Sequence, residues 1–537
     1  MPETSTPNRA SDTPGSDASV LGRVARVLKI VLALLSVVLV VLFAVTSLRR
    51  LGYPFPLEQL EGSMALAVAR VAKGLPLYGA PSFSFIPYMY SPAYFYVAAW
   101  AARLLGPGFL ALRLVSFLST LGCFAVIYAL VFTETKDRLA ALAGTGLYAA
   151  AYPVCQHWFD LGRVDSLYVL LVLLALLATR RLHPVFAALV WTLAFLAKQT
   201  IAPVALLTLC FDWKRPRRML LGVGTFLLTS FGSTALLNHA THGWFRYYIF
   251  TVPRANSDLR LHATAFFPSV VLLAPFGIAL VVIAAALLLM RVRWSNPTAH
   301  FYLLAGVSLT ALCWFLDAHA GATANTAMPV YAFLAVAFGV ALARLTHWLR
   351  GLPLAWSQAG LSLLLFAACA QLASQLYSPK LSIPSPALRA SQQEFVHWLQ
   401  SFPGDVFVVA HPYDAVLAGK AVHPDDAALH DALRPGIPAV NRPLLYEIQH
   451  AVDTESLDAI VLDRTPQQEA AFAWLPADWQ THYPILGLVP AGELQNPFAP
   501  QPRYVLLPCR ELENATRMDI TILSSDSPTP SPEAHVR

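Results

Sequence analysis

Long apolar runs recur through most of the first 376 residues, and this pattern constrains the fold more than any other feature of the sequence. The runs are 30–48, 109–132, 139–154, 164–179, 184–197, 199–211, 219–237, 266–290, 301–316, 327–343 and 355–376. Most have ~16–25 residues, about the length that crosses a bilayer as a helix. Hydrophobic residues make up 56% of the chain and charged residues 13%, against roughly 45–50% and about 25% in soluble domains. The sequence therefore predicts an all-α polytopic membrane domain of about eleven transmembrane helices, and excludes a disordered, collagen-like or purely soluble chain.

Short clusters of basic residues separate these runs. They are Arg23, Arg26 and Lys29; Lys136 and Arg138; Arg180 and Arg181; Lys214, Arg215, Arg217 and Arg218; Arg291 and Arg293; Arg344 and Arg350. The positive-inside rule places all of them, and the N-terminus, on the cytoplasmic face. Two crossings must then separate successive clusters, so the apolar stretch 184–211 is predicted to be a hairpin that turns near Lys198, Gln199 and Pro203. The net charge of +6 follows from this topology and does not imply nucleic acid.

The same topology places several acidic residues on the opposite, extracytoplasmic face. They are Glu58, Glu61, Asp160, Asp165 and Asp317. The first outer loop, 49–108, is amphipathic, and segments 62–73 and 91–105 are predicted to be interfacial helices. Acidic and basic residues thus separate to opposite faces of the predicted membrane domain.

The composition changes after residue 376, where a Pro- and Ser-rich segment is typical of a linker. The predicted organisation is a disordered cytoplasmic tail (1–29), the transmembrane domain (30–377), a linker (378–392), a small extracytoplasmic α/β domain (393–521) and a disordered tail (522–537). Buried strands of the α/β domain are predicted at 405–410, 458–463 and 504–508. An odd number of crossings places this domain outside the cytoplasm.

Metal-ligating residue types occur in the C-terminal domain, but without a recognisable pattern. His-Pro-Tyr-Asp at 411–414 and His-Pro-Asp-Asp at 423–426 match no metal motif by spacing, so we expect chance His and Asp residues on surface loops. The six cysteines form no CxxC pair and have no zinc-like spacing to histidine. Neither a disulfide framework nor a zinc site is therefore predicted.

Four segments carry candidate functional residues. Glu58 and Glu61 lie three apart at the start of a predicted helix, where they share a face, although carboxylates there can also serve only as helix caps. Asp165 can likewise cap the next helix, and Asp160 and Arg163 can form a simple local ion pair. Ionisable residues at membrane depth are nevertheless functional candidates, because burying them is costly.

The remaining two segments lie further along the chain. Lys198, at the tip of the predicted hairpin, needs a counter-charge, which a lipid phosphate could supply, or else it extends to the interface. The loop 317–329 offers Asp317, His319 and Asn325 as polar groups, or is a plain turn between two spans.

Several of these segments together resemble the polytopic glycosyltransferases with the GT-C fold. The resembling motifs are LEQLEG (57–62), ARVAKGLPLY (69–78), YSPAYFY (90–96), GRVDSL (162–167) and LAKQT (196–200). The similarity covers roughly residues 30–345 and is to bacterial members of the protein mannosyltransferase and aminoarabinose transferase type. It implies a multi-pass protein of the bacterial inner membrane.

The resemblance also implies a reaction. A sugar would move from a polyprenyl-phosphate donor to an acceptor hydroxyl on an envelope glycan, lipid or protein, with inversion and without a nucleotide. The implied roles are Glu58, Glu61 and Asp165 as catalytic residues, Arg163 and Lys198 on the donor phosphate, and Tyr90, Asp160, His319 and Asn325 on substrate. Many relatives have adjacent Asp-Glu in the first loop, whereas Gln59 and Leu60 separate the two glutamates here. Glu58 is favoured as the general base, with Glu61 supporting it.

No cofactor follows from the sequence with certainty. Metal dependence varies in this superfamily, so the resemblance leaves open a divalent cation, held by Glu58 and Asp165 if one binds. Membrane lipids are expected partners, and nucleic acid is not.

Two other functions fit parts of the pattern. Buried charges and a broken helical hairpin also suit a transporter or lipid flippase. Transporters usually contain paired internal repeats, which this sequence does not show, and a long outer loop with paired acids is more typical of a membrane transferase. A catalytically inactive scaffold whose C-terminal domain binds an envelope partner is the third alternative.

Overall fold

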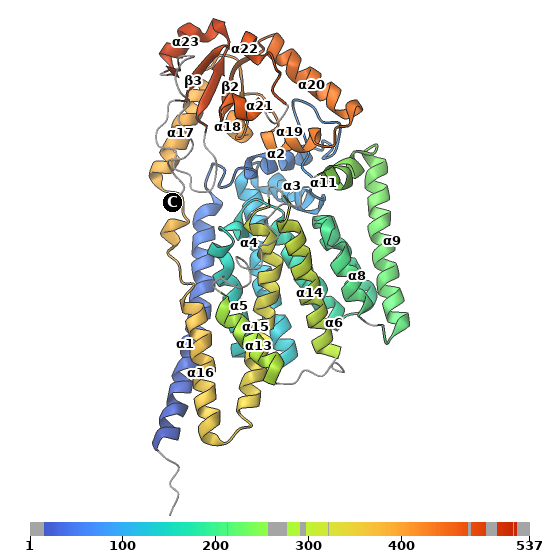
Figure 1. The fold of residues 1–537 in the computed structure, drawn as a ribbon, viewed down its shortest axis with the longest axis vertical. Coiled ribbons are helices and arrows are strands. Elements are labelled where there is room, and N and C mark those ends of the chain that lie inside the picture. The colour runs from blue at the N-terminus through green and yellow to red at the C-terminus, as the bar shows by residue number, and fades with distance from the viewer. Residues whose placement is uncertain are drawn as a thin grey trace, which may run out of the picture.

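The computed structural model describes residues 16–211, 213–255, 276–289, 297–319, 322–470, 474–489, 502–518 and 520–523. A bundle of long helices carries a smaller domain at one end (Figure 1). We call the end of the bundle that contacts this domain the domain end, and the other the opposite end.

Helices form at all eleven predicted apolar runs, including the described part of 266–290. They are α1 (Ser16–Leu51), α4 (Phe109–Thr135), α5 (Arg138–Val154), α6 (Asp165–Arg181), α7 (Pro184–Ala197), α8 (Ala202–Cys210), α9 (Pro216–Ala240), α13 (Gly277–Leu289), α14 (Pro297–Asp317), α15 (Met328–Leu349) and α16 (Leu354–Ala373). By length and composition, six helices of the described chain could each cross a membrane alone. The protein is therefore a multi-pass membrane protein.

The helical hairpin predicted at 184–211 is present. Its two helices, α7 and α8, are joined at Lys198, which has an extended backbone, and at a short 3-10 turn, Gln199–Ile201. Proline at the start of α8 fits there because the first turn of a helix has no partner for that N–H group. The break places the Lys198 side chain at the domain end of the bundle.

The N-terminal segment differs from its prediction. Residues 16–29, expected to be disordered, form the first turns of α1, because α16 packs along this helix. The hydroxyl of Ser362 donates to the carbonyl of Leu21, and Gln358 lies against Gly22. The two helices run side by side and extend past the rest of the bundle (Figure 1). Residues 1–15 lie outside the described residues.

Small residues on α5 allow close packing with two neighbouring helices. A Cβ atom added at Gly144 would lie 2.7 Å from the carbonyl oxygen of Ala335 on α15, and one at Gly339 would lie 2.8 Å from that of Ala140. On another face of α5, a Cβ at Gly146 would lie 2.7 Å from the Cα of Ser36 on α1. Such close backbone approach is a common way for helices to associate in membranes.

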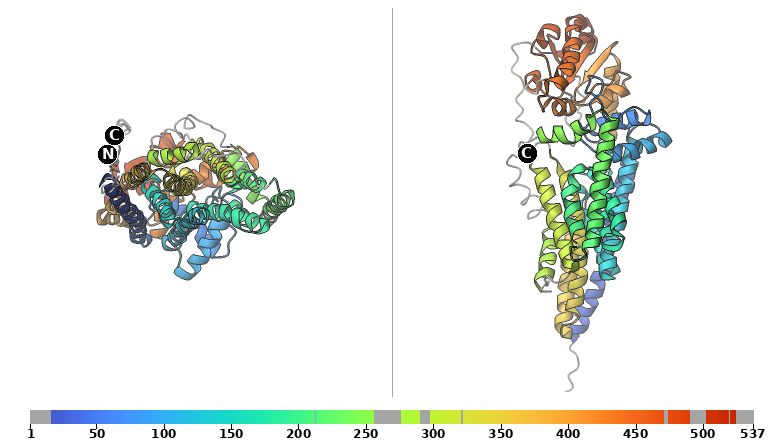
Figure 2. Two further views of the ribbon diagram at one scale, coloured as in Figure 1. Left: turned by 90° about the horizontal axis from the view of Figure 1, so that it is seen from below. Right: turned by 90° about the vertical axis from the view of Figure 1, so that its right-hand side faces the viewer.

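The first outer loop contains the two predicted interfacial helices. They are α2 (Glu61–Ala72) and α3 (Ala93–Leu105). Both lie at the domain end, across the direction of the long helices (Figure 2). Along α3, Tyr96, Trp100 and Leu104 are exposed, as suits a helix lying at a membrane surface.

The C-terminal region folds around a five-stranded sheet. Its strands are β1 (Asp405–Val408), β2 (Leu457–Leu462), β3 (Ile485–Leu488), β4 (Tyr504–Leu507) and β5 (Thr521–Ile522), in the order β1-β2-β4-β3-β5. The pair β1 and β2 is parallel and the other pairs are antiparallel. The three predicted strands are confirmed as β1, β2 and β4, whereas β3 and β5 were missed.

The predicted linker is shorter than expected. Helix α17 (Pro386–Gln400) begins seven residues earlier than the predicted domain boundary, since Ser385 accepts a hydrogen bond from the N–H of Leu388 and caps the helix. Residues 524–537, most of the tail predicted to be disordered, lie outside the described residues.

The glycine contacts lead to a stability prediction. Gly144→Ala should lower the thermal unfolding temperature of the purified protein, because the new methyl group meets a carbonyl oxygen of α15. Gly224→Ala on α9 is the matched control, since nothing lies within 4 Å of its Cβ position. Alanine favours helix over glycine by about 0.5–1 kcal/mol, so the control should equal or exceed the wild type. Equal unfolding temperatures for the two variants would contradict the packing argument.

Candidate active site

Charged and polar side chains from four segments meet at the domain end of the bundle. They come from the first outer loop, the turn before α6, the tip of the α7–α8 hairpin and the loop before α15. These are the segments that the topology placed on one face. The structure thus brings together residues that lie more than 250 positions apart in the sequence.

Glu58, Arg163 and Tyr90 form the first part of the site. An Nη1 group of Arg163 donates to Oε2 of Glu58 at 3.0 Å, and Nη2 donates to the Tyr90 hydroxyl at 3.0 Å. The guanidinium also lies over the ring of Trp158, 4.9 Å from its centre. The Glu58 side chain is 13% exposed. Burial raises the pKa of Glu58 above its usual range, although the charge of Arg163 opposes the shift.

Asp165, Lys198 and Asn325 form the second part. Nζ of Lys198 lies 3.1 Å from Oδ1 of Asp165, and the side-chain amide of Asn325 donates to the same oxygen at 3.1 Å. The other oxygen of Asp165, Oδ2, is buried and has no hydrogen-bond partner among the residues that the structure describes. A buried hydrogen-bond acceptor without a partner costs free energy. This oxygen is therefore available to accept a hydrogen bond from a bound group.

Glu61 has a different environment from Glu58. Its carboxylate accepts two hydrogen bonds from Arg113, at 2.8 Å each, one from the N–H of Leu57 and one from the N–H of Gly162. Both side chains are fully buried. Burial would raise the pKa of Glu61, but the charge of Arg113 and these four donors lower it overall. A carboxylate held in this way is a poor proton acceptor.

The Glu61–Arg113 pair fastens three segments together. The remaining N–H groups of Arg113 donate to the carbonyl oxygens of Arg50, Tyr53 and Phe55. All five donors of the guanidinium are thus used. The packing also explains why the GRVDSL motif has glycine at position 162. A Cβ atom at Gly162 would lie 2.9 Å from Leu112 and 3.1 Å from Glu61.

Asp160 forms a separate buried cluster. Its carboxylate lies 3.2 Å from Nε of Arg50 and accepts a hydrogen bond from Tyr152 at 3.0 Å. Arg50 also donates to the Tyr152 hydroxyl. This arrangement ties the end of α1 to the turn before α6, and gives no support to the prediction that Asp160 contacts substrate.

His319 is not brought to the cluster by any described contact. Its Nδ1 lies 2.7 Å from the carbonyl oxygen of Phe315 near the end of α14, and its ring packs against that of Phe315. Its predicted role in substrate binding stays a prediction. Asp317, from the same loop, accepts a hydrogen bond from Thr326 and so helps to hold the turn that carries Asn325.

The C-terminal domain closes over the first outer loop. Asp425, which is 1% exposed, accepts hydrogen bonds from the hydroxyls of Ser63 and Tyr88 and caps α19 (Asp426–Leu433). The backbone N–H of Phe83 donates to Glu447 at 2.7 Å. Ser63 and Tyr88 each lie two residues from a site residue, so the domain is attached directly beside the site.

The expectation for the two His-Pro segments was wrong. His411, Asp414, Asp425 and Asp426 are buried rather than on surface loops, because these loops pack against the first outer loop, where Tyr413 lies against Gly62. Nε2 of His411 lies 3.0 Å from Asp463. Burial disfavours the charged imidazole, but the Asp463 carboxylate outweighs it and raises the pKa of His411 to about 9.

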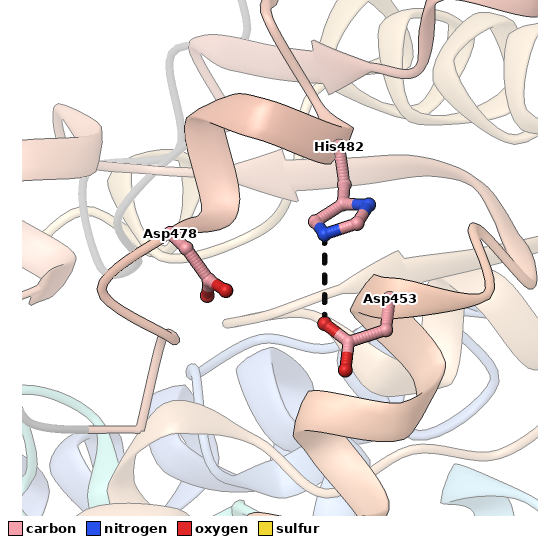
Figure 3. A group of neighbouring side chains, drawn as sticks. All are labelled: Asp453, Asp478 and His482. Carbon is pink, nitrogen blue, oxygen red and sulfur yellow. Dashed lines mark ion pairs between the residues drawn. The ribbon is translucent and has the colours of Figure 1, made fainter.

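The described residues give little support to a metal at the site. Glu58 and Asp165 already pair with Arg163 and Lys198, so this donor set fits a divalent cation poorly and we derive no step through one. Within the described chain, one group of three ligand-type side chains lies close enough to hold an ion: Asp453, Asp478 and His482 (Figure 3). It is exposed, and the Gln449 side-chain amide already donates to both carboxylates, which accounts for their proximity.

Comparisons with known proteins agree with this architecture. No family model matches the chain, and no curated protein matches it. Among solved structures, the chain is similar to ArnT from Cupriavidus metallidurans bound to undecaprenyl phosphate, with a TM-score of 0.58 and 16% identity over 88% of this chain and 97% of that chain. The apo structure of the same protein gives a TM-score of 0.56, with the same identity and coverage.

The chain has the GT-C fold. The predicted fold class, a GT-C helical domain followed by a small sheet-containing domain, is thereby confirmed. The similarity extends past residues 30–345, since 88% coverage includes part of the C-terminal region. Within the GT-C fold, the predicted residues Glu58, Tyr90, Arg163, Asp165, Lys198 and Asn325 form one group, since Nζ of Lys198 in the second part lies 6.0 Å from the centre of the Tyr90 ring in the first.

Sequence reasoning missed Arg50, Arg113, Tyr88 and Asp425. Arg113 lies inside a predicted span, 109–132, and a charged residue there needs a partner, so its position was a usable signal. Tyr88 and Asp425 gave no such signal, because their pairing joins segments 337 residues apart.

The two first-loop glutamates should differ in their effect on stability. Glu61→Gln should lower the thermal unfolding temperature strongly, because removing one partner of a buried ion pair costs about 3–5 kcal/mol. Glu58→Gln should change it much less, since Glu58 is partly exposed and holds one ion pair. Thermal unfolding of the two purified variants in the same detergent checks this. A smaller loss for Glu61→Gln than for Glu58→Gln would refute the assigned structural role.

Proposed function

We propose that this protein is a membrane glycosyltransferase that moves a sugar from a polyprenyl-phosphate donor to an acceptor hydroxyl at the extracytoplasmic face. The observation that carries the proposal is the pair of carboxylate–cation contacts, Glu58–Arg163 and Asp165–Lys198, at one end of a GT-C fold. The similar ArnT structure is bound to undecaprenyl phosphate, which supports a lipid phosphate as the group that this site binds. The topology from the basic clusters supports an extracytoplasmic location for the site and the C-terminal domain.

Glu58 is the general base in this proposal. It takes the proton of the acceptor hydroxyl as the acceptor oxygen bonds to the anomeric carbon. The bond from that carbon to the phosphate oxygen breaks, and polyprenyl phosphate leaves with the electron pair. Attack opposite to the leaving group inverts the anomeric configuration. Glu58 suits this role better than Glu61, because its carboxylate is partly exposed and burial raises its pKa.

Arg163 and Lys198 neutralise the leaving phosphate. In the free protein each already has a carboxylate partner, so neither charge is left unpaired. A donor phosphate that binds both cations would compete with Glu58 for Arg163. Glu58 would then lose its counter-charge when the donor binds, which makes it a stronger proton acceptor at the moment of reaction. Asn325 and Asp165 would hold Lys198 in position.

A transfer assay tests the proposal. Glu58→Gln should lower release of free polyprenyl phosphate at least ~100-fold, because general-base catalysis contributes about 10²–10⁴-fold. Purified protein in lipid would be given a panel of polyprenyl-phosphate sugars and an envelope acceptor extract. Glu394→Gln, an exposed glutamate on α17, is the control and should keep wild-type release. No release by folded wild-type protein with any donor would favour transport or a scaffold role instead.

The pH profile gives a second test. Activity requires the ionised form of Glu58, so kcat/KM should fall as the pH drops through its pKa. Because burial raises that pKa, the fall should begin above the usual glutamate value of about 4.3. Thermal unfolding measured over the same pH range separates this effect from acid denaturation. An acid limb at or below pH ~4.3 would argue against Glu58 as the base.

A further inference from the structure

A small basic cavity lies at the opposite end of the bundle from the candidate active site. It has a volume of about 100 Å³ and lies among the end of α6, the start of α7, the end of α8 and the first turns of α9 and α14. Its polar lining includes Arg180, Arg215 and Arg218. Among the lining residues that the structure describes, none is acidic.

The cavity is distinct from the candidate active site. Helix α6 begins at Asp165, in that site, and ends at Arg181, beside the cavity. Its 17 residues extend about 25 Å at 1.5 Å per residue. This length is close to the thickness of the hydrocarbon core of a bilayer, so the two sites lie near opposite surfaces of the membrane.

Arg180 is held in a fixed position at the cavity wall. Its Nε donates to Glu134 at 3.3 Å and its Nη2 donates to Thr298 at 2.8 Å. The guanidinium also lies over the ring of Phe301, 5.4 Å from its centre. Glu134 is shared with Arg181 at 3.2 Å, so one carboxylate faces two guanidinium groups and leaves net positive charge beside the cavity.

The surroundings are those of a membrane surface. Trp213, two residues before Arg215 in the sequence, is 67% exposed, and Leu220 and Leu221 on the first turns of α9 are also exposed. Aromatic residues and basic clusters are typical of the interface between lipid and water. Basic pockets between helices on the cytoplasmic side of membrane proteins bind anionic headgroups.

We propose that this cavity is a binding site for a phosphate group, of the kind carried by an anionic phospholipid. One water molecule needs ~10–15 Å³ by the same measure of volume, so the cavity can hold a group of several atoms. A tetrahedral phosphate matches guanidinium groups in charge and geometry. The apolar side chains Leu209 and Phe211 on one wall suit the start of an acyl chain. This site is separate from the proposed transfer reaction and does not depend on it.

Native mass spectrometry of the purified full-length protein tests the site. Wild-type protein released from detergent should retain phosphatidylglycerol at least ~10-fold better than phosphatidylcholine, since a few basic groups near anionic lipid together give this preference. This comparison requires no variant. Equal retention of the two lipids, together with no effect of inorganic phosphate on thermal unfolding, would overturn the proposal.

A pair of double variants then locates the site. R215Q/R218Q removes two positive charges from the cavity wall, and should lower phosphatidylglycerol retention at least ~5-fold. K214Q/R217Q removes two positive charges from the same exposed segment, but neither residue lines the cavity, so retention should stay within about 2-fold of wild type. Equal losses in the two variants would mean diffuse surface attraction and would refute a defined site. Size-exclusion chromatography checks that both variants fold.

Inorganic phosphate distinguishes the source of the phosphate group. Millimolar phosphate could stabilise the protein thermally, with the effect lost in R215Q/R218Q and kept in K214Q/R217Q. If lipid selectivity were absent, this result would support the site and identify free phosphate as its ligand. Selective retention of phosphatidylglycerol would support the site with a lipid ligand.

Discussion

The arrangement of this protein depends on the cost of burying charge near a membrane. A buried charge without a partner is far less stable than a pair, and four carboxylates at the domain end each have a cationic partner: Glu61 with Arg113, Asp160 with Arg50, Glu58 with Arg163 and Asp165 with Lys198. Each pair joins segments that are distant in the sequence. The ion pairs therefore determine which loops meet. The apolar helices position these loops so that the paired charges are shielded from water.

The four pairs differ in how completely they are satisfied, and this difference separates structural from reactive groups. Glu61 and Arg113 have every hydrogen-bonding position filled by protein atoms, and they join the first loop, α4 and the turn before α6. Asp165 keeps one oxygen without a protein partner, and Glu58 is partly exposed. The saturated Glu61–Arg113 pair gives rigidity to the loops, whereas Glu58 and Asp165 lie where a hydroxyl and a phosphate would meet in the proposed reaction.

Much of the fold was predictable because hydrophobic length and the distribution of basic residues are local properties of the sequence. These properties predicted the helices at the eleven apolar runs, the broken hairpin at 184–211 and the location of the acidic loops at one end of the bundle. Segments whose structure depends on a distant partner were missed. Residues 16–29 are helical because α16 packs beside them. Strand β5 has only two residues and pairs with β3, and neither strand was identified from the sequence pattern. In the site, Glu58 and Lys198 were visible as charges in apolar surroundings, whereas Asp425 reaches the first loop only through tertiary packing.

The hydrogen bond between Ser63 and Asp425 joins residues 362 positions apart, and this has a consequence for synthesis of the chain. The membrane helices up to α16 leave the ribosome before the C-terminal domain exists. The first outer loop then lacks its contacts with the C-terminal domain until that domain has been synthesised and has folded. Completion of the site therefore coincides with completion of the polypeptide, so a nascent or prematurely terminated chain can be inserted correctly and still lack the finished site.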